Sequence, residues 1–474
     1  MKRATAYIAL VSLLTPILSE AASAHALAQR YDLPLPLGYF LAGCGAAVAA
    51  TFVIFALFFR KRSHSEKPAS RAILVTAIPG VLVAGLRLLS VAFAILLVIA
   101  GLFGNPGTFK NIAPVAVWVI WWVGFGFLVA FVGNIWPLIN PWSAIFELAE
   151  FCARRRPGEL SFRLHYPEWL GAWPGCALFL LFAWLELVAP GRDVPRNIAI
   201  GIIIYSLMTW TGFAVFGRET WLKNGEVFSV AFGLFGRFAP LTFNKNGRYC
   251  VRVRPFAAGL LTHEPLSASM TGFVLLILGT VTVDGLMETP QWAEIVRLAI
   301  GDDVDPRLYM IMQTALLVAG PLILAARYIA TAAAMARLSR SKLEEVAGLF
   351  VLSLVPIAIA YHLAHYFSLF AIAGQFIIPL ASDPFGYGWD LFGTSLYRID
   401  IGIVDARFIW YLCVAAIVTG HIAAVWVGHA TAVSAFGSMR IAARSQYPML
   451  LLMVGYTMLS LWILAQPIVE QGAR

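Results

Sequence analysis

Long runs of apolar residues separated by short polar segments are the main pattern along this chain. A run of about 20 apolar residues can cross a bilayer as a helix. After an N-terminal apolar segment, such runs lie at about 38–59, 80–103, 113–133, 174–190, 197–216, 267–287, 308–331, 347–373, 407–430 and 447–466. The pattern predicts an all-α polytopic membrane protein, with about ten transmembrane helices forming a single domain over residues 25–474.

The N-terminal segment has the features of a secretion signal. A basic start (residues 1–3) precedes an apolar run (4–18), and residues 22–24 form a small-x-small cleavage pattern, Ala-Ser-Ala. We therefore predict that residues 1–24 are a signal peptide, or an uncleaved signal anchor of the same orientation. Cleavage would leave His25 at the N-terminus, where an α-amine and an imidazole could together chelate Cu²⁺.

Three other stretches are too short or too polar to be spans. Asn140 followed by proline predicts a helix start, so residues 141–153 are expected to form an interfacial helix. Residues 226–239 are apolar but short, and we expect a second helix lying on the inner membrane surface. Alternating residues around Asn246-Gly247 predict a small cytoplasmic β-hairpin.

Composition supports the membrane assignment. Of the 474 residues, 60% are hydrophobic and 12% charged, and the mean hydropathy is +0.80. A soluble domain has roughly a quarter of its residues charged. These values exclude a secreted enzyme, a nucleic-acid-binding module and an ectodomain with a single anchor. The five cysteines show no C-x-x-C spacing and indicate no disulfide framework.

The distribution of basic residues predicts the orientation. The net charge is +9, and the loops on one side of the predicted spans hold 21 Lys and Arg residues against 8 on the other. Positive loops stay in the cytoplasm, facing anionic lipid. We therefore expect a multi-pass protein of the bacterial inner membrane, with its mature N-terminus on the periplasmic side. The lipid bilayer explains the basic excess, and no nucleic-acid partner is implied.

Histidines are concentrated in two adjacent predicted spans. Ionisable groups inside a membrane cost about 2.5–3.5 kcal/mol on insertion scales, so each is a functional candidate. His362 and His365 lie three residues apart on one helix face, and His421 and His429 occupy the next span. His365 and His421 are expected at upper to middle depth, and His429 near the inner surface. Alternatively, these histidines only hydrogen-bond neighbouring helices.

Carboxylates lie at the outer ends of other predicted spans, on the same side as His365. They are Glu186, Asp284 and Glu288. Imidazoles and carboxylates at one depth suit Zn²⁺ or a similar divalent metal, which would lower the pKa of a bound water toward 7. The predicted metal ligands are His362, His365, His421, Asp284 and Glu186. Solvated carboxylates at helix ends are the alternative interpretation.

The loop after the eighth predicted span has the composition of a lid. Its glycines and Asp383-Pro384 predict turns, and Phe385, Trp389 and Phe392 are apolar enough to cover a cavity or bind an apolar substrate. Asp383 and Asp390 could add metal ligands, although a turn-capping role suits Asp383 equally well. Signatures of metalloproteases, serine esterases, P-loop ATPases and dinucleotide enzymes do not occur in the sequence.

Several motifs resemble those of a known family. They include HALAQRYDLPLP, VWVIWWVG, FAWLELV, VTVDG, AHYFSL, SDPFGYGWDLFGT and SQYPMLLLMVGYT. Together they cover nearly the full length, and the chain resembles bacterial polytopic membrane proteins labelled fenitrothion hydrolases. The resemblance implies a membrane-bound hydrolase that cleaves the bond from phosphorus to the aryloxy group of an apolar organophosphorus triester.

The residues and the resemblance lead to one main hypothesis and two alternatives. In the hypothesis, Asp284, His365 and His421 carry metal-assisted hydrolysis. In the first alternative, the same groups line a transport path for a metal ion or protons, with His429 at its inner exit. In the second, the protein is a redox or assembly subunit that carries haem or copper.

Overall fold

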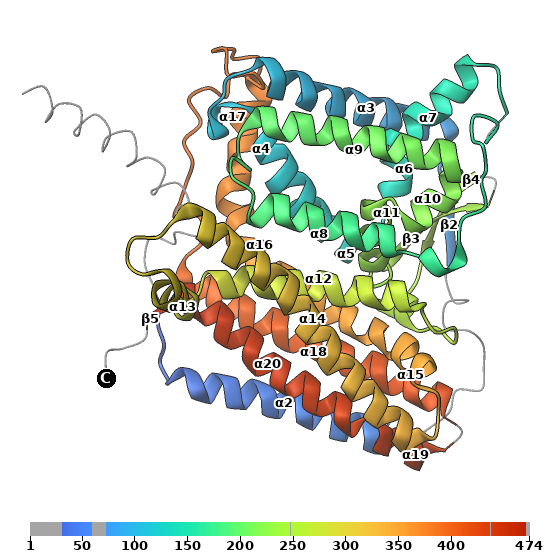
Figure 1. Ribbon diagram of the computed structural model, residues 1–474, viewed down its shortest axis with the longest axis vertical. Coiled ribbons are helices and arrows are strands. Elements are labelled where there is room, and N and C mark those ends of the chain that lie inside the picture. Colours follow the sequence, from blue (N-terminus) through green and yellow to red (C-terminus); the bar gives the residue numbers. More distant parts are fainter. Residues whose placement is uncertain (1–30, 59–72, 157, 247, 437, 471–474) are drawn as a thin grey trace, which may run out of the picture.

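The computed structural model describes residues 31–58, 73–156, 158–246, 248–436 and 438–470. The predicted signal segment 1–24 and the predicted copper ligand His25 lie outside these residues. Within them, ten helices are long and apolar enough to cross a membrane. This confirms the predicted all-α polytopic fold (Figure 1).

Six of the membrane-length helices in the described residues are single unbroken elements. They are α2 (Leu37–Phe58), α3 (Gly80–Phe103), α9 (Pro195–Phe216), α12 (Ala268–Met287), α14 (Pro306–Ser339) and α18 (Ala406–Ala435). The other four spans are composite. One joins α4 (Ile112–Pro114), a π-helix (Val115–Phe125) and α5 (Gly126–Phe131), and another joins α15 (Leu343–Phe350), α16 (Val355–Ala373) and α17 (Ile377–Ser382). The span Glu168–Leu187 joins a 3₁₀-helix (Glu168–Leu170) and α8 (Trp173–Leu187), and the span Met439–Ile468 joins α19 (Met439–Ser445) and α20 (Tyr447–Ile468).

Shorter elements lie between the spans and at the chain ends. The helices are α6 (Trp136–Ile139), α7 (Pro141–Cys152), α10 (Arg218–Asn224), α11 (Val227–Gly236) and α13 (Pro290–Ile300). The strands are β1 (Tyr31–Asp32), β2 (Ile73–Ala77), β3 (Leu241–Asn246), β4 (Arg248–Val253) and β5 (Val469–Glu470).

The two ends of the helix bundle are built differently (Figure 1). The lid end is the one that carries α13, α17 and the loop 383–405, and the sheet end carries β2–β4, α7, α15 and α19. The described chain starts and finishes at the lid end, where β1 pairs in parallel with β5 and Tyr31 lies opposite Val469. The charge pattern predicts that the lid end faces the periplasm, and this orientation stays a prediction.

A three-stranded antiparallel sheet closes the sheet end. The hairpin predicted around Asn246 is present, with Asn246 opposite Arg248 across β3 and β4. β2 adds a third strand on the other side of β4, with Ile73 opposite Val253. The alternating pattern around the hairpin turn gave no sign of this strand, because β2 lies far away in sequence, directly before α3.

The two short helices expected at the inner surface differ in position. α7 starts as predicted, since the Asn140 side chain accepts a hydrogen bond from the Ser143 backbone N–H at 3.0 Å. α11 does not lie on the surface, because eight of its ten residues are buried. Its apolar residues cover all its faces, and such a helix is stable only inside the bundle. Its N-cap, Glu226, is itself fully buried.

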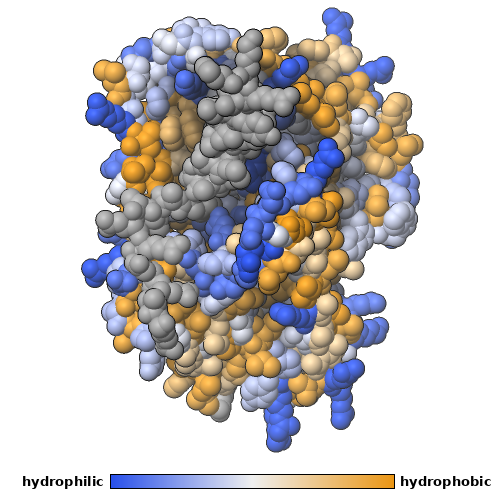
Figure 2. Space-filling model, turned by 60° about the vertical axis from the view of Figure 1, so that its left-hand side comes forward, coloured by the Kyte–Doolittle hydropathy of each residue, from blue (hydrophilic) through white to orange (hydrophobic). Residues whose placement is uncertain are grey.

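Burial divides the spans into a central helix and peripheral ones. The span Leu343–Ser382 contains α16, and 89% of the residues in its most apolar stretch are buried. In the most apolar stretches of α3 and α14, only 11% of the residues are buried. α16 packs against α12 and α18, while α3 and α14 expose apolar faces suited to lipid. Figure 2 turns the lid end forward and shows hydrophilic residues near the middle of this face, with hydrophobic residues on either side.

Gly420 lets α18 approach α16 closely. A Cβ at this position would lie 2.3 Å from the Ala360 Cβ and 2.9 Å from the Pro356 carbonyl oxygen. Such contacts cannot be relieved by turning a flexible side chain, because the neighbouring atoms belong to a short side chain and to the backbone. The packing around α16 therefore depends on a glycine here.

We predict that Gly420→Ala destabilises the bundle by about 1–3 kcal/mol, the usual effect of overpacking. Thermal unfolding of the detergent-purified protein, followed by tryptophan fluorescence, measures this. Gly455→Ala in α20 is the matched control, because a Cβ there meets nothing within 4 Å; its stability should be unchanged or higher. Equal melting temperatures for the two variants would contradict the packing described.

Candidate metal centre

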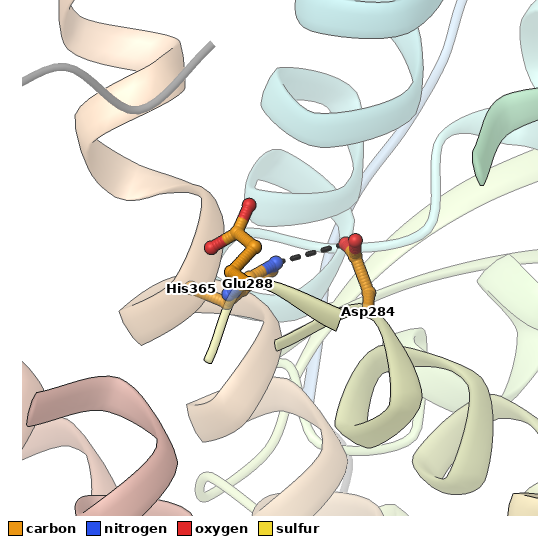
Figure 3. A group of neighbouring side chains, drawn as sticks. All are labelled: Asp284, Glu288 and His365. Carbon is orange, nitrogen blue, oxygen red and sulfur yellow. Dashed lines mark hydrogen bonds and ion pairs between the residues drawn. The ribbon is translucent and has the colours of Figure 1, made fainter. Parts of the chain in front are cut away.

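Two carboxylates and one imidazole converge near the lid end. Asp284 lies in the last turn of α12, and Glu288 follows the helix as its C-cap residue. Residues four apart share one helix face, so both carboxylates turn toward α16, where His365 is located. One potential ligand atom from each of the three residues lies within 4.8 Å of the other two. Figure 3 shows this group of three.

Hydrogen bonds fix the Asp284 carboxylate. Its Oδ2 lies 2.8 Å from the His365 Nε2 and accepts a hydrogen bond of 2.6 Å from the Tyr366 hydroxyl. The His365 side chain is 3% exposed and that of Asp284 is 12% exposed. A buried carboxylate needs such donors, because in a medium of low dielectric constant each unpaired charge is costly. The Asp284 side chain thus stays partly accessible, whereas His365 is almost fully enclosed.

Gly285 allows α12 and α16 to come close at this point. A Cβ on Gly285 would lie 2.9 Å from the Tyr361 hydroxyl and 3.6 Å from the His365 Nδ1. It would also lie 2.8 Å from the Ile463 Cγ2 of α20. A larger residue would push α16 away from α12. The VTVDG segment thus provides both a ligand and the space that the opposite ligand needs.

The donor set of the group of three fits a divalent metal. Two carboxylates and one imidazole are ligands that Zn²⁺ and similar borderline metals accept, and catalytic zinc sites use three protein ligands with one open position. Buried carboxylates in a membrane need a compensating cation or a proton. The group therefore has the chemistry of a metal centre with room for one exogenous ligand.

His362 and Glu186, two predicted metal ligands, lie beside this group and not in it. Both line an enclosed cavity of about 20 Å³, which has room for one water molecule, and Tyr366 forms another part of its wall. The His362 ring packs against Tyr366, with centroids 4.9 Å apart. Among the described residues, His362 Nε2 has no hydrogen-bond partner. The ligand atoms of His362 and Glu186 are not among those that lie within 4.8 Å of one another in the group of three.

His421, predicted as a catalytic residue and a metal ligand, lies deeper in the bundle. The α18 residue at the depth of His365 is Cys413, whose Sγ lies 3.3 Å from the Ala364 carbonyl oxygen. His421 is eight residues further along α18, about 12 Å toward the sheet end. Its Nδ1 lies 2.8 Å from the Ile417 carbonyl oxygen, one turn back on the same helix. The structure therefore does not bring His421 to the group of three.

The predicted substrate-binding residues lie in the loop between α17 and α18. Phe385 packs on Trp389 with ring centroids 5.4 Å apart. The Phe385 carbonyl oxygen accepts a hydrogen bond of 2.7 Å from the Asn105 backbone, which ties the loop to the end of α3. Trp389 is 44% and Phe392 71% exposed. Their role in binding an aryl group stays a prediction.

The aspartates of this loop hold its turns. Asp383 accepts hydrogen bonds from the Tyr387 and Gly388 backbone N–H groups at 3.0 and 2.7 Å. Asp390 accepts hydrogen bonds from Ser382 and Ser395. Hydrogen bonds from these donors lower the pKa of Asp390 below its usual value. Both side chains therefore act as turn caps, the alternative that the sequence suggested for Asp383.

Two members of the site were missing from the predicted ligand set. Glu288 was noted as an end-of-span carboxylate, and its spacing of four from Asp284 is the signal that could have placed it beside Asp284. Tyr366 follows His365 directly, but an adjacent aromatic residue gives no pattern that distinguishes a hydrogen-bond donor from packing. His429 lies toward the sheet end, where its ring stacks on Phe55.

The fold and the group of three define a class: a helical polytopic membrane protein with a candidate metal centre near one end of the bundle. No family model, no curated protein and no solved structure matches this chain.

We predict that the purified protein binds one Zn²⁺ per chain and that Asp284→Asn, Glu288→Gln and His365→Gln each abolish binding. Equilibrium dialysis followed by elemental analysis measures the stoichiometry. Asp303→Asn, an exposed carboxylate at the same end, is the matched control and should keep the metal. His421→Ala should keep it too; loss of zinc in a well-folded His421→Ala would contradict the site described.

Proposed function

We propose that this protein is a metal-dependent hydrolase of the bacterial inner membrane that cleaves apolar organophosphorus triesters. The observation that carries the proposal is the convergence of Asp284, Glu288 and His365 within 4.8 Å of one another. Three protein ligands with an open position are typical of hydrolytic metal sites. The resemblance of the sequence to fenitrothion hydrolases supports the substrate class.

The position of the site suits a substrate that dissolves in lipid. Asp284 lies three residues before the end of α12, close to the predicted periplasmic surface. An apolar triester partitions into the bilayer, so a site at membrane depth meets it at a higher concentration than a site in water does. Apolar residues around the site also exclude bulk water, which strengthens electrostatic interactions within it.

The reaction adds water to phosphorus and releases the aryloxy group. Water attacks phosphorus, the bond from phosphorus to the aryl oxygen breaks, and one proton of the water passes to the leaving aryloxide, so the products are a diester and a phenol. A divalent metal supplies Lewis-acid activation when bound. Asp284 orients the His365 imidazole through their 2.8 Å hydrogen bond, and Tyr366 orients Asp284.

We predict that the zinc-loaded protein in detergent releases the yellow nitrophenol of fenitrothion, and that chelation stops the release. His365→Gln and Asp284→Asn should lower the rate at least about 100-fold, since they remove ligands of the metal that would activate the water. Asp303→Asn should react at the wild-type rate. No release from zinc-loaded, folded wild-type protein would contradict the hydrolase and leave the metal site standing.

Transport of a divalent ion is a second candidate, favoured by one observation. Buried polar atoms continue from the group of three toward the sheet end, and among the described residues Tyr361 Oη, His421 Nε2 and Ser460 Oγ have no hydrogen-bond partner. Tyr361 lies one turn below His365 on α16, and His421 lies deeper on α18. An ion entering at Asp284 would find these groups below it.

His421→Ala separates the two candidate functions. A hydrolase confined to the group of three should keep its activity in this variant, because His421 lies about 12 Å deeper. A transporter should lose zinc uptake into proteoliposomes. We expect hydrolysis to persist and wild-type proteoliposomes to take up no zinc beyond protein-free vesicles; uptake abolished by His421→Ala would favour transport.

A further inference from the structure

The enclosed cavity beside the candidate metal centre has a polar wall that no function described so far uses. The cavity lies between α8, α12, α16 and the π-helix, and its volume of about 20 Å³ has room for one water molecule. Apolar side chains such as Phe179 and Phe235 form much of the wall. The polar side chains in the wall are Trp122, Glu186, Thr280, His362 and Tyr366.

The indole N–H of Trp122 indicates that this cavity holds a ligand. Trp122 is 5% exposed, and its Nε1 has no hydrogen-bond partner among the described residues. The indole lies close to the Glu186 carboxylate but lacks the geometry of a direct hydrogen bond to it. A buried donor without a partner costs about 1–3 kcal/mol. A small group that accepts this N–H is therefore expected between the two side chains.

His362 gives the cavity a second polar group in need of a partner. It is 4% exposed, and in the described part of the chain its Nε2 has no hydrogen-bond partner. The rings of Trp122, Phe127, Phe235 and Tyr366 surround the imidazole, with centroids 4.9–5.8 Å away. The faces and edges of these rings offer no conventional hydrogen bond, so the partner is expected in the cavity that His362 lines.

The hydrogen-bonding groups of the wall select water over an ion. An indole nitrogen only donates, and an ionised carboxylate only accepts. A cation in this small space would meet the positive end of the Trp122 N–H, and an anion would meet the negative charge of Glu186. A water molecule can accept from Trp122 and donate to Glu186 and His362 at the same time.

We propose that this cavity holds one buried water molecule, which bridges Trp122, Glu186 and His362. The Tyr366 ring forms part of the same wall and packs on His362, while its hydroxyl donates to Asp284 at 2.6 Å. The water fills the space beside the Tyr366 ring and so keeps the ring in place. Glu186 and His362 are then positioning residues, which act on the candidate metal centre through Tyr366.

The test is a set of structures of the full-length protein, at a resolution that shows ordered water, for the wild type, Glu186→Gln and Glu186→Leu. In the wild type we expect one water peak about 2.7–3.2 Å from Trp122 Nε1 and from a Glu186 oxygen. Glu186→Gln keeps an acceptor, so it should keep the water and the hydrogen bond from Tyr366 to Asp284. Glu186→Leu is equally uncharged but has no acceptor, so the water should be lost and that hydrogen bond should lengthen or break.

Thr280→Val is the matched control. Thr280 lines the cavity, but its hydroxyl donates to the Ile277 carbonyl oxygen at 3.0 Å and is not needed for the bridge. This variant should keep the water.

The wild-type structure alone tests the water site if Glu186→Leu does not fold. No density in the wild-type cavity would overturn the proposal, as would a metal ion there, identified by its anomalous scattering. Loss of the water in Thr280→Val would overturn the assigned hydrogen bonds. A retained water or an unmoved Tyr366 in Glu186→Leu would also overturn the proposal.

Discussion

The hydrogen bond between Asp284 and His365 joins two helices inside the membrane, and the rest of the site depends on it. A carboxylate at this position is stable only if donors or a cation compensate its charge. His365 and Tyr366 supply the donors, Gly285 lets their helix come close enough, and Glu288 follows one turn later. A second carboxylate beside the first raises the local negative charge, and a bound divalent cation would balance it.

The fold and two of the three candidate ligands, Asp284 and His365, could be predicted from the sequence for identifiable physical reasons. Apolar runs of membrane length need no tertiary information, so the spans could be found directly. Asp284 and His365 were brought together because alternating spans put them on one side of the membrane at similar depth. His421 was placed in the same site on a count of residues from the helix end, but the register of α18 against α16 puts Cys413 at that level. Register between helices depends on contacts such as Gly420 against Ala360, which no periodicity reveals.

The other differences between the sequence predictions and the structure also arise from contacts between helices. Residues 227–236 were expected on the membrane surface because they are too short to span, yet their apolar residues on every face fit the interior better. Tyr366 escaped notice because tyrosine in a span usually packs, and only the position of Asp284 makes it a donor. The length and apolarity of a segment predict whether it enters the membrane. Which side chains contact one another inside the membrane depends on side-chain geometry, which the sequence does not show.

The two ends of the molecule differ in chemistry. Carboxylates gather with His365 near the lid end, whereas at the sheet end Arg87 and Arg218 pair with Glu147 and Glu219. With the predicted orientation, the acidic site faces the periplasm and the paired charges of the sheet end face the cytoplasm.

The central claim is that Asp284, Glu288 and His365 hold one divalent metal. X-ray absorption spectroscopy at the zinc edge of the zinc-loaded protein tests it most directly, because the spectrum reports the number and type of ligands. The account predicts oxygen and nitrogen ligands at about 2.0–2.2 Å, with scattering from a single imidazole that disappears in His365→Gln. Two or more imidazoles, sulfur ligation, or an unchanged spectrum in His365→Gln would contradict it.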